Sequence, residues 1–191
     1  MLRTVAEHQA LVSRFFDTAA GALDRAADAL VETVRAGGKI LWFGNGGSAA
    51  DAQHFAGELV GGMGQGRSGL AAIALTTDTS VLTSLANDFD FPSVFARQIR
   101  ALGRPGDAAV GISTSGRSEN VRNGLLEARR CGLRTLALLG RDGGSIRPVA
   151  DLVLVVPGEN TQRIQEVHLV IGHLLCERIL EAVRPAPEDP A

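Results

Sequence analysis

The side chains best suited to proton transfer stand in two segments that are far apart in the chain. In the first, His54 and Glu58 are four residues apart within the run DAQHFAGEL, so on a helix they share one face about one turn from each other. In the second, His173 stands in an apolar run. His54 and Glu58 could share a metal ion or an acid–base task, and an imidazole in an apolar setting such as that of His173 can be functional. The spacing alone also fits an exposed helical pair and a buried structural histidine, and it is not the HExxH pattern of zinc proteases.

A glycine-rich run, GNGGS at residues 44–48, could bind a ligand through its backbone. Its glycines allow a ligand to approach closely, and Ser48 is expected to cap the helix that follows. The run lacks the third glycine of the GxGxxG dinucleotide fingerprint and the Walker A lysine, so it does not indicate nucleotide binding. A tight turn followed by a cap is the alternative interpretation.

The run ISTSGRS, residues 112–118, is the better candidate for an anion site. It carries four hydroxyl groups and leads into a predicted helix, whose N-terminal N–H groups can hold a phosphate without cationic side chains. A serine-rich capping loop is the alternative, although four hydroxyl groups exceed what one cap uses. These groups belong to Ser113, Thr114, Ser115 and Ser118.

Composition excludes several classes of partner. The 191 residues carry a formal net charge of -2, and only 4% are aromatic, with no tyrosine. The chain therefore offers neither a cationic field for nucleic acid or an anionic membrane nor a platform for stacking bases. No signal peptide core or membrane-spanning apolar run is present, so we expect a cytoplasmic protein. Cys131 and Cys176 form no CxxC pair and are expected to be buried thiols.

The elements that must position these groups alternate between helical periodicity and short apolar runs. Apolar residues at helical spacing predict one long or two shorter helices over residues 5–35, ended by Gly37 and Gly38. Five runs of strand length follow, with helical stretches between them. We predict strands at 39–43, 70–75, 108–112, 135–139 and 152–156, and helices at 48–60, 81–85, 94–102, 118–131 and 163–183.

Apolar strands with little alternation are typical of a parallel sheet covered on both faces. We therefore predict an α/β fold, one domain over residues 1–184, with a doubly wound parallel sheet and an added N-terminal helical segment at about residues 5–36. The proline-rich residues 185–191 are predicted to form a flexible tail. Ligands bind beyond the carboxyl ends of the strands in such a sheet, and both loops described above follow strands.

A third polar segment, residues 84–92, is predicted to be a loop after a short helix. Its Asp88 could receive hydroxyl groups of a ligand, although Asn and Asp also simply favour turns. We interpret His8, Glu166 and His168 as structural or surface groups.

Four segments in this order resemble one known family. GNGGSAADAQHFAGEL, SLANDFDF, ISTSGRSENV and RIQEVHLVIGH together are similar to the sedoheptulose-7-phosphate (phosphoheptose) isomerases, which belong to the sugar isomerase (SIS) domain superfamily. The resemblance covers about residues 39–180. The first and third segments alone indicate only the superfamily, and their combination with Gln165 and His173 is much more specific.

The resemblance implies a flavodoxin-like fold, a homotetramer with active sites at subunit interfaces, and conversion of sedoheptulose 7-phosphate to D-glycero-D-manno-heptose 7-phosphate. It gives the hydroxyl-rich loop to the phosphate, the base role to Glu58 and the acid/base role to His173. Further substrate contacts fall on Asn45, Gly46, Gly47, Ser48, Asp88 and Gln165. Family members that bind zinc, one ion per subunit, use the positions of His54, Glu58, Gln165 and His173.

The chemistry of these residues agrees with such a reaction. Moving a carbonyl from C2 to C1 requires removal of a proton from C1, an enediol(ate), and return of a proton to C2, which suits one carboxylate and one imidazole. Zinc bound to Glu58 would lower its basicity. Gln165 and His173 are eight residues apart, a rise of about 12 Å on one helix. Sharing an ion then requires long side chains, a helix start near Gln165, or two subunits.

Three features depart from the family pattern, and two alternative functions stay open. Arg117 stands where the family usually has Asn, Gln162 replaces an acidic residue, and residues 63–68 give no clear match. One alternative is a non-catalytic SIS protein of the DnaA-initiator-associating type, which binds a partner protein. Those relatives lack the terminal histidine, so His173 together with Glu58 favours the isomerase. The other is an SIS isomerase or regulator for another sugar phosphate.

Overall fold

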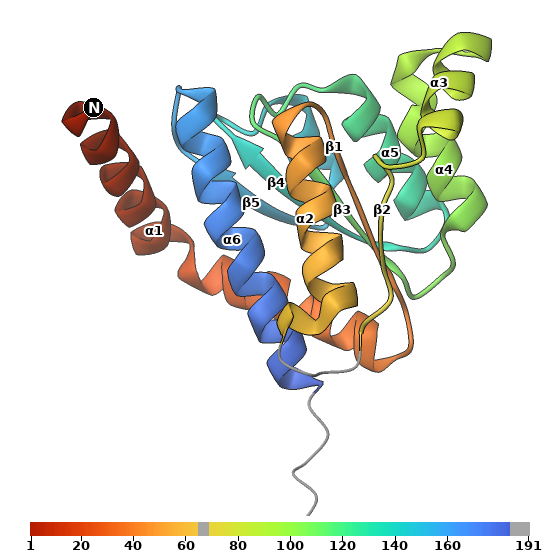
Figure 1. The fold of residues 1–191 in the computed structure, drawn as a ribbon, viewed down its shortest axis with the longest axis horizontal. Coiled ribbons are helices and arrows are strands. Elements are labelled where there is room, and N and C mark those ends of the chain that lie inside the picture. The colour runs from red at the N-terminus through yellow and green to blue at the C-terminus, as the bar shows by residue number, and fades with distance from the viewer. Residues whose placement is uncertain (65–68, 184–191) are drawn as a thin grey trace, which may run out of the picture.

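A single parallel sheet of five strands forms the centre of the molecule, in the order β2-β1-β3-β4-β5 (Figure 1). The computed structural model describes residues 1–64 and 69–183, so the predicted tail and most of the unmatched segment 63–68 lie outside the described residues. The chain turns from β1 to the edge strand β2 and then back to β3, which confirms the doubly wound topology. The strands are β1 (Ile40–Gly44), β2 (Ala72–Ala74), β3 (Ala108–Ser113), β4 (Arg134–Gly140) and β5 (Leu152–Val156).

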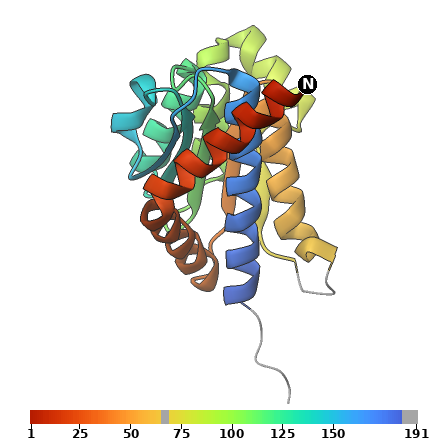
Figure 2. The same cartoon turned by 90° about the vertical axis from the view of Figure 1, so that its left-hand side faces the viewer.

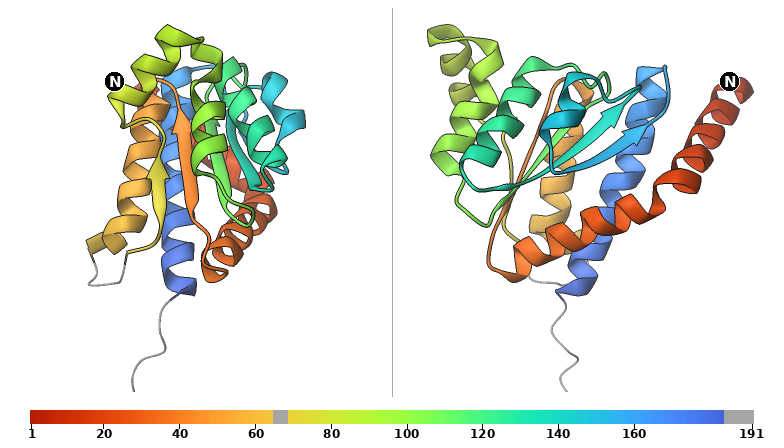
Figure 3. Two further views of the ribbon diagram at one scale, coloured as in Figure 1. Left: turned by 90° about the vertical axis from the view of Figure 1, so that its right-hand side faces the viewer. Right: turned by 180° about the vertical axis from the view of Figure 1, so that it is seen from behind.

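Helices cover both faces of this sheet (Figures 2 and 3). Successive strand residues point to opposite faces, so Ile40 and Trp42 join one apolar core, whereas Leu41 and Phe43 join the other. The first core is closed by α1, α2 and α6, and the second by α4 and α5, with α3 packed against its margin. The helices are α1 (Leu2–Arg35), α2 (Gly47–Gly61), α3 (Thr79–Asp88), α4 (Val94–Leu102), α5 (Glu119–Arg130) and α6 (Thr161–Ala182).

The N-terminal segment is one continuous helix of 34 residues. Its apolar residues from Leu11 to Val31 enter the first core, while residues 1–7 are exposed and His8 contacts Glu166 of α6 over 2.7 Å. Within residues 1–64 and 69–183 no helix, this long one included, is apolar enough over a sufficient length to cross a membrane.

Three local predictions are wrong. Asp88 is not in a loop, because the Asp78 side chain caps α3 at Val81 N and the helix continues through Asp88. Ser48 does not cap α2, because Gly46 takes the N-cap position and Ser48 is already helical. Of the two cysteines, Cys176 is buried as predicted, but Cys131 is only half-buried because it follows the end of α5; neither forms a disulfide in the described part of the chain.

Candidate active site

The glycine-rich loop and the hydroxyl-rich loop leave the sheet side by side. Gly44 at the end of β1 pairs with Ile112 near the end of β3, so the two loops begin at the same edge. Asn45 and Asn120 join them, since each amide donates to the other over 2.8 Å. Asn120 is buried, and sequence reasoning missed it; its one signal is its position two residues after the hydroxyl-rich run. The predicted phosphate loop is thereby tied to the glycine loop.

The hydroxyl groups of the second loop converge on one another. Ser113 Oγ lies 3.0 Å from Ser118 Oγ and 3.3 Å from Ser115 Oγ. Ser118 occupies the N-cap position of α5 without a side-chain capping bond, because its hydroxyl is directed to Ser113. Gly116 adopts φ +65° where the loop packs against the backbone of Gly143. The loop therefore presents hydroxyl groups beside a helix N-terminus, the arrangement that favours an anion.

Arg117, the cation that departs from the family pattern, is directed to a neighbouring loop. Its guanidinium Nη2 donates to both carboxylate oxygens of Asp142, over 2.9 and 3.3 Å. The backbone N–H of Gly144 also donates to Asp142, and this bond, together with Arg117, holds the pKa of the Asp142 carboxyl below its ordinary value. Both members of the pair are exposed.

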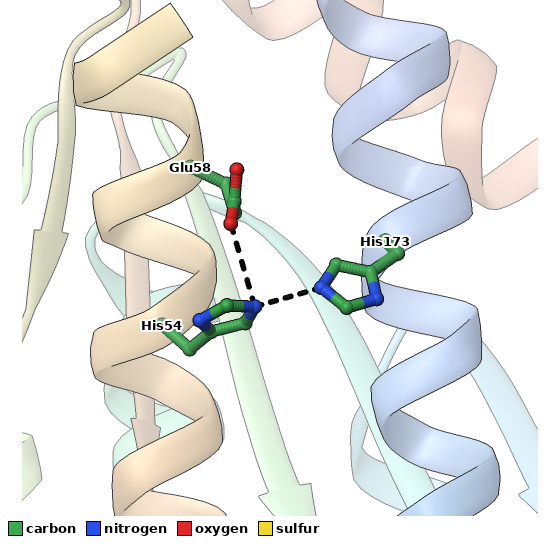
Figure 4. Close-up of side chains that lie close together, drawn as sticks. All are labelled: His54, Glu58 and His173. Carbon is green, nitrogen blue, oxygen red and sulfur yellow. Dashed lines mark hydrogen bonds and ion pairs between the residues drawn. The ribbon is translucent and has the colours of Figure 1, made fainter. Parts of the chain in front are cut away.

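Three of the predicted chemical groups meet between α2 and α6. His54 Nε2 lies 2.7 Å from His173 Nε2 and 3.5 Å from Glu58 Oε1 (Figure 4). Glu58 and His173 are half-buried and His54 is exposed. One nitrogen or oxygen from each of the three lies within 4.8 Å of the others, so the set could hold a metal ion. We call these three residues the acid–base cluster.

The close approach of the two helices depends on a glycine. A Cβ atom on Gly172 of α6 would overlap the ring of Phe55 of α2. That ring in turn packs edge-on against His54 and His173, with centroids 5.8 and 6.2 Å away. Gly172 and Phe55 together therefore fix the separation at which the two imidazoles meet.

The acid–base cluster opens to a hollow on the exposed side of α2. This hollow has a volume of about 430 Å³ and is lined in part by His54 and Glu58. A hollow of this size can take a small ligand. The other lining residues are Gln53, Gly57, Gly61 and Met63.

Gln165, the fourth predicted metal residue, lies at the other end of the α2–α6 contact. Its Nε2 donates to Asp51 Oδ1 over 3.2 Å, and its amide lies against Gly47 of the glycine loop. Glu58 is eleven residues further along α2 than Gly47, a rise of about 16 Å. In this arrangement Gln165 belongs with the glycine loop, and its part in a metal site stays a prediction.

Asp51 is a second residue that sequence reasoning missed. Its side chain is buried, and burial raises the pKa of its carboxyl, against the opposing effects of the Gln165 hydrogen bond and of nearby His54. Buried carboxyl groups with altered pKa values gather at functional sites, although structural networks contain them too. Its signal in the sequence was its place one helical turn before His54.

The remaining predicted residues differ in their exposure. Asp88 is exposed at the end of α3 and accepts a hydrogen bond from Asn87. Ser48 is buried, and Gly46 and Gly47 are exposed. His168 is structural, since it is fully buried and its Nε2 lies 3.0 Å from the carbonyl oxygen of Leu139, which stands opposite Ser113 in the sheet.

Comparison with known proteins matches this geometry to one family. Residues 5–140 fit the SIS domain family. The phosphoheptose isomerase of Paramagnetospirillum magneticum is 56% identical over 162 residues, which cover 85% of this chain and 84% of the relative. That of Geobacter sulfurreducens is 53% identical over 166 residues, covering 87% and 88%.

Solved structures agree with the sequence relatives. The structure of the phosphoheptose isomerase from Neisseria gonorrhoeae superposes with a TM-score of 0.88 at 45% identity, over 93% of this chain and 95% of that one. The corresponding enzyme from Francisella tularensis gives a TM-score of 0.87 at 35% identity, over 93% and 94%. The chain therefore belongs to the SIS domain family and, within it, to the phosphoheptose isomerases.

Proposed function

We propose that this protein interconverts sedoheptulose 7-phosphate and D-glycero-D-manno-heptose 7-phosphate through an enediol(ate). The observation that carries the proposal is the contact between His54, His173 and Glu58, which places a carboxylate and two imidazoles together (Figure 4). Proton transfer between adjacent carbons needs one base and one group that can serve the oxygens. The phosphoheptose isomerase relatives support the choice of a heptose phosphate.

In this proposal the hydroxyl-rich loop holds the phosphate. Ser113, Ser115 and Ser118 supply convergent hydroxyl groups, Thr114 adds a fourth, and the N-terminus of α5 adds the positive end of its dipole. The sugar is bound by Asn45, Gly46, Gly47, Ser48, Asp88 and Gln165.

Glu58 acts as the base that removes the proton from C1, and His173 serves the oxygen atoms or opens the sugar ring. Two neutral imidazoles in contact through Nε2 require that one ring donates and the other accepts. Without a bound ion, the His54–His173 contact of 2.7 Å would therefore keep one proton between the two rings, next to Glu58. We expect His54 to set the tautomer of His173.

Zinc fits the donor set of the acid–base cluster. Two imidazole nitrogens and one carboxylate oxygen are ligands that zinc prefers, and three protein ligands leave a position open. His54, Glu58 and His173 would hold the ion, whereas Gln165, the fourth ligand that the family implies, lies with the glycine loop in this chain. Bound zinc would polarise a substrate oxygen and lower the basicity of Glu58.

The homotetramer with active sites at subunit interfaces is part of the same proposal. Apolar side chains on the same two helices are exposed: Leu174, which follows His173 in α6, is 37% exposed, and Val60, two residues after Glu58 in α2, is 55% exposed. Exposed apolar residues around a polar site are typical of a surface that another subunit covers. The distance along α2 between the glycine loop and Glu58 also favours sites completed by a second subunit.

The test is turnover of sedoheptulose 7-phosphate by the purified protein in D2O, followed by NMR. We expect an aldose phosphate that carries deuterium at C2, and a severe loss of turnover in Glu58→Gln and His173→Ala. Glu177→Gln and His8→Ala, at positions outside the cluster, are the matched controls. A wild-type protein that binds the sugar phosphate without turning it over would contradict the proposal and favour a non-catalytic SIS protein.

Metal content is measured on the same samples. We expect about one zinc per subunit in the wild type and a reduced content in His54→Ala. Full activity with substoichiometric zinc would instead make the ion incidental to the reaction.

A further inference from the structure

The contact between Asp51 and Gln165 joins two residues that are far apart in the sequence. Asp51 lies in the second turn of α2 and Gln165 in the second turn of α6. Asp51 Oδ1 accepts a hydrogen bond of 3.2 Å from Gln165 Nε2. The contact stands beside the glycine loop, where the proposed function places the sugar.

This contact determines which end of the Gln165 amide faces the site. Asp51 Oδ1 accepts this bond, and only the NH2 end of an amide side chain can donate one. The NH2 end of the amide therefore faces Asp51, and the carbonyl oxygen Oε1 is turned away from it. An amide without such a neighbour could present either end.

Gly47 supplies the space for this orientation. A Cβ atom at position 47 would overlap both the oxygen and the nitrogen of the Gln165 amide. The amide thus lies flat against the backbone of the glycine loop, with Asp51 at its nitrogen. Gly47 and Asp51 of α2 therefore give the Gln165 amide of α6 one position and one orientation.

The Asp51 carboxyl group would be unfavourable at this position if its only role were to stabilise the fold. The residue is 6% exposed, and its Oδ2 has no hydrogen-bond partner among the described residues. A buried polar oxygen without a partner destabilises the folded state. Such a group calls for an explanation other than packing.

We propose that Asp51 is a positioning residue that presents Gln165 Oε1 to a hydroxyl group of the sugar phosphate. The inference rests on the proposed function, in which Gln165 takes the sugar, and it adds the residue that determines which end of the Gln165 amide meets the O–H of a polyol chain. Asp51 acts through Gln165 and does not itself touch the reacting atoms.

The test is a double-mutant cycle with Asp51→Ala, Gln165→Ala and the double variant. We expect Asp51→Ala to lower kcat/KM by about 10- to 100-fold, the size of effect seen when a group that orients a ligand is removed. In the Gln165→Ala background the same change should lower it less than about twofold, because the two residues act as one unit. Independent, multiplicative effects would overturn the proposal.

Asp51→Asn separates orientation from charge. The asparagine keeps an oxygen that accepts from Gln165 Nε2, so we expect it to retain more activity than Asp51→Ala. Equal losses in the two variants would overturn the proposal in favour of a role for the charge. Asp17→Ala, an exposed aspartate on α1, is the matched control.

Two readouts do not depend on turnover. The urea concentration at the midpoint of unfolding should be at least as high for Asp51→Ala as for the wild type, because the substitution removes the unpartnered oxygen. A midpoint that falls together with activity would show that the role of Asp51 is structural and would overturn the proposal. The second readout is calorimetry: the wild type, Asp51→Ala, Gln165→Ala and the double variant are each titrated with the polyol phosphate that is obtained by reducing the substrate. If the wild type binds this polyol without isomerising the ketose, the proposed reaction fails, yet the binding cycle still decides whether Asp51 acts through Gln165.

Discussion

Asn45 and Asn120 exchange two amide hydrogen bonds and so connect the glycine loop to the first turn of α5. Asn120 Oδ1 also accepts from the backbone N–H of Val121. The side chain that joins the loops thus also stabilises the helix start that is proposed to receive the phosphate. Rigidity at this edge of the sheet comes from a pair of neutral amides.

Replacing Asn120 with alanine should therefore affect both stability and phosphate binding. Loss of the pair leaves the Asn45 amide without its partner, and we expect the free energy of unfolding to fall by about 1–3 kcal/mol. In the proposed function the loops hold the phosphate and not the reacting carbons, so KM should rise more than kcat falls. Urea unfolding and steady-state kinetics measure the two effects, and an unchanged KM would contradict the proposed role. Asn123→Ala, on the same helix, is the control.

His168 should make stability depend on pH. Burial lowers the pKa of its imidazole from 6.5 to about 4, so the unfolded chain takes up a proton at a higher pH than the folded one. The contribution of this residue is present above about pH 6.5 and is lost as the pH falls toward 4. His168→Gln keeps a donor for the Leu139 carbonyl and does not titrate there.

We expect His168→Gln to lose about 2 kcal/mol less of its free energy of unfolding than the wild type when the pH is lowered from about 7 to about 5. Urea unfolding at the two pH values is the measurement. His8→Gln serves as the comparison, since His8 is half-buried and lies 2.7 Å from Glu166. Equal losses in His168→Gln and the wild type would show that another group governs the dependence.

Variants of Arg117 and Asp142 should show whether the Arg117 guanidinium assists phosphate binding. Because Asp142 holds the guanidinium at the neighbouring loop, Arg117→Asn is expected to change KM by less than about twofold, as for exposed ion pairs in general. Asp142→Ala, which releases Arg117, should lower KM at low salt, and the effect should vanish at high salt. A large rise of KM in Arg117→Asn would instead place the guanidinium on the phosphate.

Hybrid oligomers test whether the sites lie at subunit interfaces. If the phosphate loop of one subunit serves the acid–base cluster of another, mixing inactive Ser115→Ala with inactive Glu58→Gln restores one intact site per hybrid pair. Refolding the two variants together and assaying turnover measures this. If activity stays at the level of the separate variants while mass spectrometry shows hybrids, each subunit holds a complete site.

The sequence was sufficient for most of the architecture, because burial leaves a regular pattern. The apolar runs predict every strand to within a few residues, and β2 is the least accurate because it is short and lies at the edge of the sheet. Helix periodicity predicts α2 and α6 and places His54 and Glu58 on one face. The glycine- and hydroxyl-rich loops are predicted at the edge where the structure has them.

What could not be predicted are the contacts between elements. His54 meets His173, Gln165 meets Asp51, and Arg117 meets Asp142, each through the packing of elements from separate parts of the chain. Local spacing carries no information on how closely two helices approach. For the same reason the four-residue metal set resolves into a group of three and a separate Gln165.

Gly172 controls how closely the two imidazoles of the acid–base cluster approach each other, although it carries no side chain of its own. The missing methyl group at that position lets the Phe55 ring lie between the helices and brings two imidazoles into contact. A side chain there would act as a spacer and widen the gap between α2 and α6, and both histidines would remain present but out of reach of each other. Two residues that carry no acid–base group, Gly172 and Phe55, thus determine the distance between the two imidazoles.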